Sequence, residues 1–96
     1  MARYRLTRRA ESDLLDVFLF GLERFGETQS ERYRVELERC FRLLAETLGL
    51  GRSARIIAPD VRRHEHERHI ILCEEDADGI LVLALVHARS VRRLKL

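Results

Sequence analysis

The chain has 96 residues, a formal net charge of +2 and an apolar fraction of 46%, the size and composition of one small globular domain. It has no stretch of the roughly 20 consecutive apolar residues that a membrane-spanning helix needs. Its first residues also lack the apolar segment of a secretory signal. We therefore expect a single cytoplasmic domain over residues 1–96, with no membrane partner.

The basic residues gather at the two ends of the chain. Residues 1–9 and residues 87–96 each carry a charge of +4 with no acidic residue, which leaves −6 for residues 10–86. If the first and last elements lie side by side, their arginines form one basic patch suited to a nucleic acid or an acidic protein surface. Solvated termini explain the same pattern equally well.

The N-terminal residues predict a short strand and then an amphipathic helix. Residues 3–6 alternate polar and apolar side chains, as a half-buried edge strand does. Thr7 is a suitable cap for a helix that starts at Arg8 and ends at Phe25-Gly26. Helical spacing predicts that its core face consists of Ala10, Leu14, Val17, Gly21 and Phe25.

A second helix is expected after only a few residues. Thr28 and Glu31 have the spacing of a capping box, in which the hydroxyl and the carboxylate each bond to an unpaired backbone N–H. Apolar side chains then recur with the helical period as far as Gly49, a typical C-terminal breaker. Because the connection is short, the two helices should form an antiparallel hairpin.

The C-terminal part of the chain predicts strands. Residues 49–53 indicate a loop, Pro59-Asp60 a turn, and the segment ending at Gly79 a hairpin turn. The apolar run 80–86 belongs inside a sheet. The expected strands are 61–66, 70–73 and 80–86. The order predicts an α+β fold (β-α-α-β-β-β) in which a three-stranded antiparallel meander and the N-terminal strand share one sheet under the helical hairpin.

The cysteines and histidines show no recognisable metal or redox motif. Cys40 and Cys73 fall in different elements without CxxC spacing, and we interpret both as reduced core thiols. His64 and His66 would share one face of a strand, with His69 close by. A solvated polar strand explains them as well, since metal sites usually need three or four converging ligands. We predict neither a metal site nor a cofactor.

The chain also lacks the motifs of common enzymes, because it has no glycine-rich phosphate loop, no Ser-His-Asp arrangement and no HExxH. The remaining candidates for a functional role are arginines and histidines. They suit a binding protein, or a metal-free ribonuclease that acts on a ribose 2′-hydroxyl and a phosphate.

A succession of short segments covers nearly the whole chain and resembles ParE-type toxins. The segments are residues 4–14 (YRLTRRAESDL), Phe25-Gly26, Tyr33 with Leu37, Leu44-Ala45, Gly51-Arg52, residues 59–62 (PDVR) and residues 82–89 (VLALVHAR). Two positions depart from the family pattern. Cys73 stands where many ParE-like chains have an aromatic residue, and residues 47–50 (TLGL) replace a frequent proline.

The resemblance implies the toxin of a bacterial type II toxin–antitoxin pair in the RelE/ParE superfamily. ParE-like members act on DNA gyrase and block replication, whereas RelE-like members cut mRNA on the ribosome. A cognate antitoxin, ParD-like for the former, wraps the toxin in a hetero-oligomer and silences it. A toxin-like chain that binds antitoxin without being active is a third alternative.

The residues favour gyrase over the ribosome as the target. A ribosome-dependent nuclease must hold a splayed mRNA base, usually by stacking on an aromatic side chain. The last aromatic residue of this chain is Phe41, in the second predicted helix. We therefore expect inhibition without catalysis. In the alternative, a cationic cleavage site would consist of Arg62, Arg63, His87 and Arg89, with His87 as general acid or base.

Two sets of residues are predicted to contact partners. The toxic contact with gyrase is expected from the basic tail, through His87, Arg89, Arg92 and Arg93. The antitoxin is expected to bury apolar residues off the main core stripe of the first helix and to bring acidic residues to nearby arginines. Its predicted contacts are Leu15, Phe20, Leu22, Arg5 and Arg9.

Overall fold

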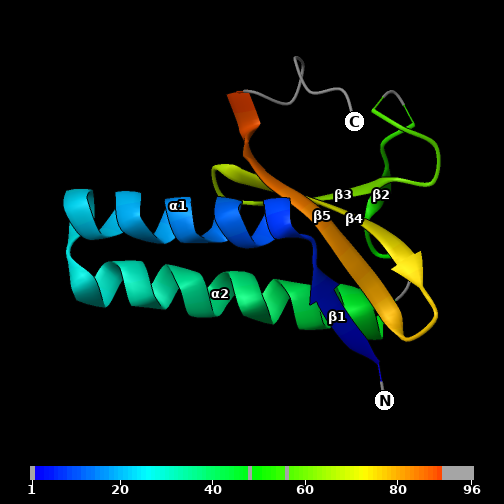
Figure 1. Cartoon of the computed structure of the whole chain (residues 1–96), viewed down its shortest axis with the longest axis horizontal. Coiled ribbons are helices and arrows are strands. Elements are labelled where there is room, and N and C mark those ends of the chain that lie inside the picture. The colour runs from blue at the N-terminus through cyan, green and yellow to red at the C-terminus, as the bar shows by residue number, and fades with distance from the viewer. Residues whose placement is uncertain (1, 48, 56, 90–96) are drawn as a thin grey trace.

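A computed structural model of the chain describes residues 2–47, 49–55 and 57–89. The elements are β1 (Arg3–Leu6), α1 (Arg8–Phe25), α2 (Glu27–Glu46), β2 (Arg52–Ser53), β3 (Arg62–His66), β4 (His69–Asp76) and β5 (Gly79–His87). The two helices form an antiparallel hairpin beside a five-stranded sheet (Figure 1). The predicted α+β arrangement is confirmed. Within the described residues, neither helix is apolar enough over a sufficient length to cross a bilayer.

The strands lie in the order β1-β5-β4-β3-β2, so the apolar β5 is an interior strand, as predicted. Strands β3, β4 and β5 form the antiparallel meander, and β1 pairs with β5 in parallel, with Arg3 opposite Gly79. The loop predicted at 49–53 is wrong in part, because Arg52 and Ser53 form β2 beside β3. The pairing of β2 with β3 is supported by Arg62, whose Nη1 donates to the Gly51 carbonyl at 3.0 Å. The alternation of polar and apolar residues does not predict this contact.

The two helices begin differently. Thr7 caps α1 as predicted, since its hydroxyl accepts from the Ala10 N–H at 3.0 Å and donates to the Leu83 carbonyl at 2.8 Å. The predicted capping box of α2 is wrong, because α2 starts at Glu27 with Gly26 as its cap and no side-chain capping bond. Gly26 links the helices alone, at φ 87° and ψ 172°, a backbone conformation essentially restricted to glycine.

The main core lies between the helical hairpin and the sheet. Leu37 and Phe41 of α2 are fully buried against Ile71 and Val82, and the Phe41 ring packs on Tyr4 with 5.3 Å between centroids. A smaller core on the opposite face of the sheet is covered by the segment after β2. Its buried members are Ala54, Val61, Ile70, Leu72, Ala84 and Val86.

Three predicted core residues can be compared with this packing. Cys73 is buried, and burial raises the pKa of its thiol to about 11, whereas Cys40 is only half-buried. Phe25, predicted to lie in the core, is 57% exposed, so that prediction is wrong. The reason is position: the tip of the hairpin, where Phe25 lies, projects beyond the edge of the sheet (Figure 1).

Replacing Gly21 with valine is expected to lower the free energy of unfolding by about 2 kcal/mol, as overpacking typically does. A Cβ at Gly21 would lie 2.8 Å from the Ser30 hydroxyl oxygen, where the helices touch. That hydroxyl is fixed by donating to the Phe18 carbonyl at 2.6 Å. Chemical denaturation measures the change. Ser12→Val, at an exposed position of α1, is the control for the helix propensity of valine, and an equal effect at both positions would contradict the packing argument.

Candidate functional site

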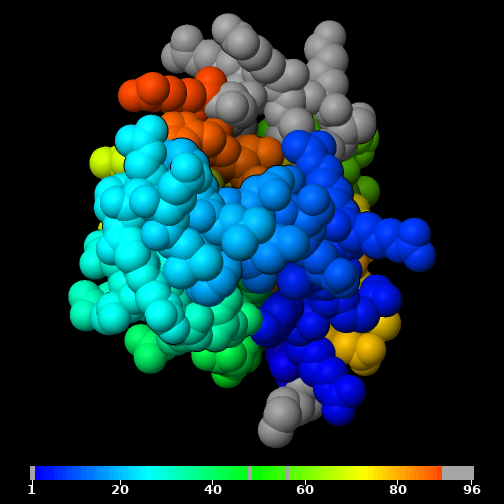
Figure 2. Space-filling model, turned by 60° about the vertical axis from the view of Figure 1, so that its left-hand side comes forward, coloured from blue at the N-terminus to red at the C-terminus, as the bar shows by residue number. Residues whose placement is uncertain are grey.

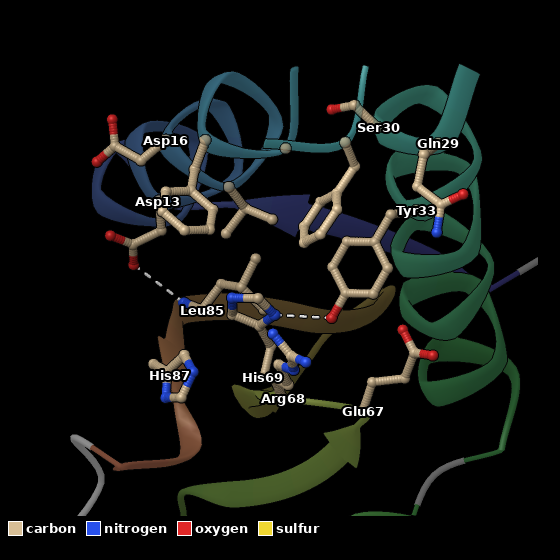
Figure 3. Close-up of a pocket in the computed structure, with 14 residues that line it drawn as sticks. Asp13, Asp16, Gln29, Ser30, Tyr33, Glu67, Arg68, His69, Leu85 and His87 are labelled. Atoms are coloured by element: carbon tan, nitrogen blue, oxygen red, sulfur yellow. Dashed lines mark hydrogen bonds between the residues drawn. The ribbon is translucent and has the colours of Figure 1, made fainter. Parts of the chain in front are cut away.

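A pocket of about 610 Å³ opens between the helical hairpin and one end of the sheet (Figure 3). Val17, Phe20 and Phe25 of α1 form its apolar wall, together with Leu85 of β5. Its polar side comes from both helices, from the turn between β3 and β4 and from the end of β5. The polar and charged lining residues are Asp13, Asp16, Gln29, Ser30, Tyr33, Glu67, Arg68, His69 and His87.

Three histidines meet at this end of the sheet because of the strand register. His66 is opposite His69 on the neighbouring strand, and His69 is opposite His87 on the next. The His69 and His87 rings lie edge to face with 5.7 Å between centroids. Tyr33 of α2 reaches this row, with its hydroxyl 2.7 Å from His69 Nδ1 (Figure 3). Tyr33, His69 and His87 therefore line the pocket together, and His66 lies beside them.

Burial favours the uncharged forms of two of these groups. It lowers the pKa of His69, and the neighbouring His87, His66 and Arg68 lower it further. Burial likewise raises the pKa of the Tyr33 hydroxyl, and the nearby Glu67 adds to the effect. The bond between Tyr33 and His69 thus joins two neutral partners and ties α2 to the centre of the sheet.

Side chains of α1 fix the end of β5, where β1 no longer accompanies it. The Asp13 carboxylate accepts from the Leu85 N–H at 3.0 Å (Figure 3). It also lies 3.5 Å from the Arg9 guanidinium. Thr7, the N-cap residue that precedes α1, also binds the backbone of β5 through its N–H and its hydroxyl. The direction in which β5 leaves the sheet is therefore set by α1.

The chain that follows β5 starts at the pocket. His87 is exposed, and its Nδ1 accepts from the Arg89 N–H at 3.1 Å, while the Ala88 N–H donates to the Arg68 carbonyl at 2.8 Å. These bonds hold the first residues of the tail against the β3–β4 turn. Of the residues predicted to contact gyrase, His87 and Arg89 lie here, and Arg92 and Arg93 lie outside the described residues.

The residues of the alternative cleavage site are not brought together. Arg62 and Arg63 pair with Cys73 and Leu72, which lie four and three residues along β4 from His69, beside which His87 lies. Three or four residues along a strand correspond to roughly 10–13 Å. Both arginines are also engaged locally, Arg62 with the Gly51 carbonyl and Arg63 with Glu65 at 2.9 Å.

Within the described residues, the start of the N-terminal basic segment lies far from Arg89. Parallel pairing places Arg3 beside Gly79, at the start of β5, whereas Arg89 follows the end of that strand. The length of β5 separates them by roughly 25 Å. Figure 1 shows the N-terminus and the end of β5 at opposite ends of this edge of the sheet.

The apolar residues predicted to meet the antitoxin lie on the hairpin surface. Leu15 is 56% exposed and Phe20 54%, while Leu22 is half-buried. Leu19, one turn after Leu15, is also exposed and was not predicted. Figure 2 shows α1 lying across this side of the molecule. The two arginines pair within the chain, Arg5 with Asp76 at 2.9 Å and Arg9 with Asp13.

The sequence interpretation missed Tyr33 and His69 as pocket residues. A signal for His69 was present, because His66 and His69 flank the two residues Glu67-Arg68, the spacing of a tight hairpin that places both histidines side by side. Tyr33 carried no comparable signal. Its place over β4 depends on how far α2 extends along the sheet.

Comparisons with known proteins agree on one family. Residues 4–92 match the family model described as "ParE toxin of type II toxin-antitoxin system, parDE". The chain is 32% identical to Toxin ParE1 of Caulobacter vibrioides over 71 residues, which are 74% of each protein. A structure titled "Chromosomal ParDE TA system from P. aeruginosa" superposes with a TM-score of 0.77 at 19% identity, over 91% of this chain and 96% of the other.

A more distant likeness shows the wider fold group. The structure of a RelB-RelE antitoxin-toxin complex from Methanococcus jannaschii has a TM-score of 0.54 at 14% identity, over 93% of this chain and 95% of the matched chain. The RelE/ParE-like fold predicted from the sequence is confirmed. The family model covers nearly the whole chain, and so the chain belongs to the ParE toxin family of type II toxin–antitoxin systems.

Proposed function

We propose that this ParE toxin arrests growth by binding DNA gyrase through the basic segment that begins at His87, without catalysis of its own. The observation that carries the proposal is the way the tail starts: His87 and Arg89 are exposed at the end of a fixed strand. Three further basic residues follow in the sequence, Arg92, Arg93 and Lys95. Such a segment suits an acidic protein surface or a protein–DNA complex.

A direct comparison of two activities tests the proposed target. Purified toxin should inhibit DNA supercoiling by gyrase in proportion to its concentration, and it should leave mRNA intact in a translating extract. The second candidate, ribosome-dependent RNA cleavage, is disfavoured by the separation of Arg62 and Arg63 from His87. Cleaved mRNA with normal supercoiling would reverse the assignment. The absence of both effects would indicate an inactive toxin-like chain.

We further propose that a ParD-like antitoxin covers the exposed apolar side of α1. Leu15, Leu19 and Phe20 are about half exposed, although they are large apolar residues. Leu15 and Leu19 share one side of α1, and Phe20 follows Leu19. Apolar residues presented in this way suit a partner helix. Acidic residues of the antitoxin would compete with Asp76 and Asp13 for Arg5 and Arg9. The result would be a cytoplasmic hetero-oligomer in which the toxin is silenced.

Substituting Leu15 or Phe20 with glutamate is expected to weaken antitoxin binding at least about tenfold, because each change places a charge in a desolvated contact. Toxicity and thermal stability should remain, since both side chains are more than half exposed in the free toxin and neither belongs to the basic tail. Surface plasmon resonance with the cognate antitoxin measures the affinity. Leu43→Glu, at a half-exposed apolar position of α2, is the matched control. Unchanged affinity in both α1 variants would contradict the proposed contact.

A further inference from the structure

Three potential metal ligands converge beside the pocket, from α2, from β3 and from the β3–β4 turn. They are Glu36, His66 and Glu67, whose ligand atoms all lie within 4.8 Å of one another. His66 Nε2 lies 3.1 Å from Glu36 Oε1 and 4.0 Å from Glu67 Oε2. Glu67 also lines the pocket, so the cluster adjoins it.

We propose that Glu36, His66 and Glu67 form a binding site for one Zn²⁺ ion. Two carboxylates with one imidazole match the nitrogen and oxygen ligands that zinc accepts in open sites. Mg²⁺ and Ca²⁺ fit less well, because they prefer oxygen ligands alone. A water molecule or a donor atom of a bound partner completes the coordination.

The distances are close to those of a coordinated ion. With bonds of 2.0–2.1 Å in a tetrahedral arrangement, neighbouring ligand atoms lie about 3.4 Å apart. The Glu36–His66 pair, at 3.1 Å, already has this separation. The Glu67 carboxylate must approach His66 by about 0.6 Å from its 4.0 Å distance, and its side chain, 62% exposed in a turn, is free of packing that would prevent this.

His66 is oriented by groups around the rest of its ring. Cys40 Sγ lies 3.6 Å from Nδ1, and the Tyr33 ring packs beside the imidazole with 5.5 Å between centroids. With zinc on Nε2 the ring proton is held at Nδ1, where the Cys40 sulfur is the facing acceptor. Such a partner on the second ring nitrogen is typical of histidine ligands.

The local charge also favours a cation. Among the residues that the structure describes, Glu36 and Glu67 have no lysine or arginine partner within 4.0 Å, and the basic side chain that both face is the single imidazole of His66. A divalent ion would balance the charge of both carboxylates. Binding would cross-link α2 to the β3–β4 turn beside the pocket.

Calorimetric titration of the full-length, tag-free chain with Zn²⁺ tests the proposal. One ion per chain is expected to bind, and excess Mg²⁺ should not displace it. Glu36→Gln, His66→Gln and Glu67→Gln should each weaken binding at least about tenfold. Two changes on the same strand, His64→Gln and Glu65→Gln, are matched controls that should leave the affinity unchanged. The imidazole NMR signals of His66, but not those of His64, should shift on zinc addition.

Several results would overturn the zinc site. The first is that the unmodified chain binds no zinc, and the second is that the control variants weaken zinc binding as much as the ligand variants. The third is that His69→Gln or His87→Gln abolishes zinc binding while Glu67→Gln leaves it unchanged. If His66→Gln fails to fold, Glu67→Gln decides the question alone, because its exposed position in a turn tolerates the change. None of these measurements depends on the toxin's cellular target, so the zinc site is tested independently of the proposed function.

Discussion

Removal of residues 89–96 is expected to abolish growth arrest and gyrase inhibition completely while the domain stays folded. The deleted segment contains four of the chain's basic residues and no acidic one. The strand before it is held by other contacts, through Thr7 and Asp13 of the N-terminal part. The domain should therefore keep most of its free energy of unfolding. Growth on induction and chemical denaturation measure the two effects.

Charge and length of the tail can be separated with full-length variants. Arg89→Gln, Arg92→Gln and Arg93→Gln combined should abolish gyrase inhibition if the positive charge makes the contact. A matched control removes three exposed arginines of α2 instead, with Arg32→Gln, Arg39→Gln and Arg42→Gln, and should remain toxic. A truncated chain that still arrests growth, or a control that loses toxicity equally, would contradict a tail-specific contact.

Local patterns were sufficient to predict the order of elements. The helical spacing, the Thr7 cap and the glycine after Phe25 placed α1 correctly, and the apolar run after Gly79 predicted an interior strand. Errors arose where the backbone conformation of a single glycine or a contact with a distant segment decided the structure. Glu27 starts α2 because Gly26 permits an abrupt link, and Arg52 becomes a strand residue because β3 lies beside it.

The candidate site was less predictable than the fold, for the same reason. His66, His69 and His87 were visible as single residues, but their alignment depends on two strand registers, including an irregularity between Leu72 and Cys73. The exposure of Leu15 and Phe20 followed from their position off the core stripe, which is a local property of one helix. The convergence of Glu36 with Glu67 depends on how α2 packs against the sheet. The spacing of residues in the sequence does not predict that Glu36 and Glu67 lie close together.

Gly79→Ala is expected to be the most destabilising single change proposed for this chain. Gly79 begins β5 opposite Arg3, and β1 passes so close that an added Cβ would lie 2.0 Å from the Arg3 carbonyl oxygen and 2.9 Å from its nitrogen. Both contacts are with backbone atoms, so no side-chain rotation relieves them. β1 must move away, and Tyr4 then loses its packing on Phe41.

The expected cost of Gly79→Ala is at least about 3 kcal/mol, since overpacking adds to the strain of a φ of 154°. For a domain of this size, that loss lowers the melting temperature by about 12–24 °C. Gly49→Ala is the matched control, because Gly49 also has a positive φ of 91° but has no atom within 4 Å of its added Cβ. It should cost only about 1 kcal/mol. Equal melting temperatures for the two variants would show that the close approach of β1 to β5 does not govern stability.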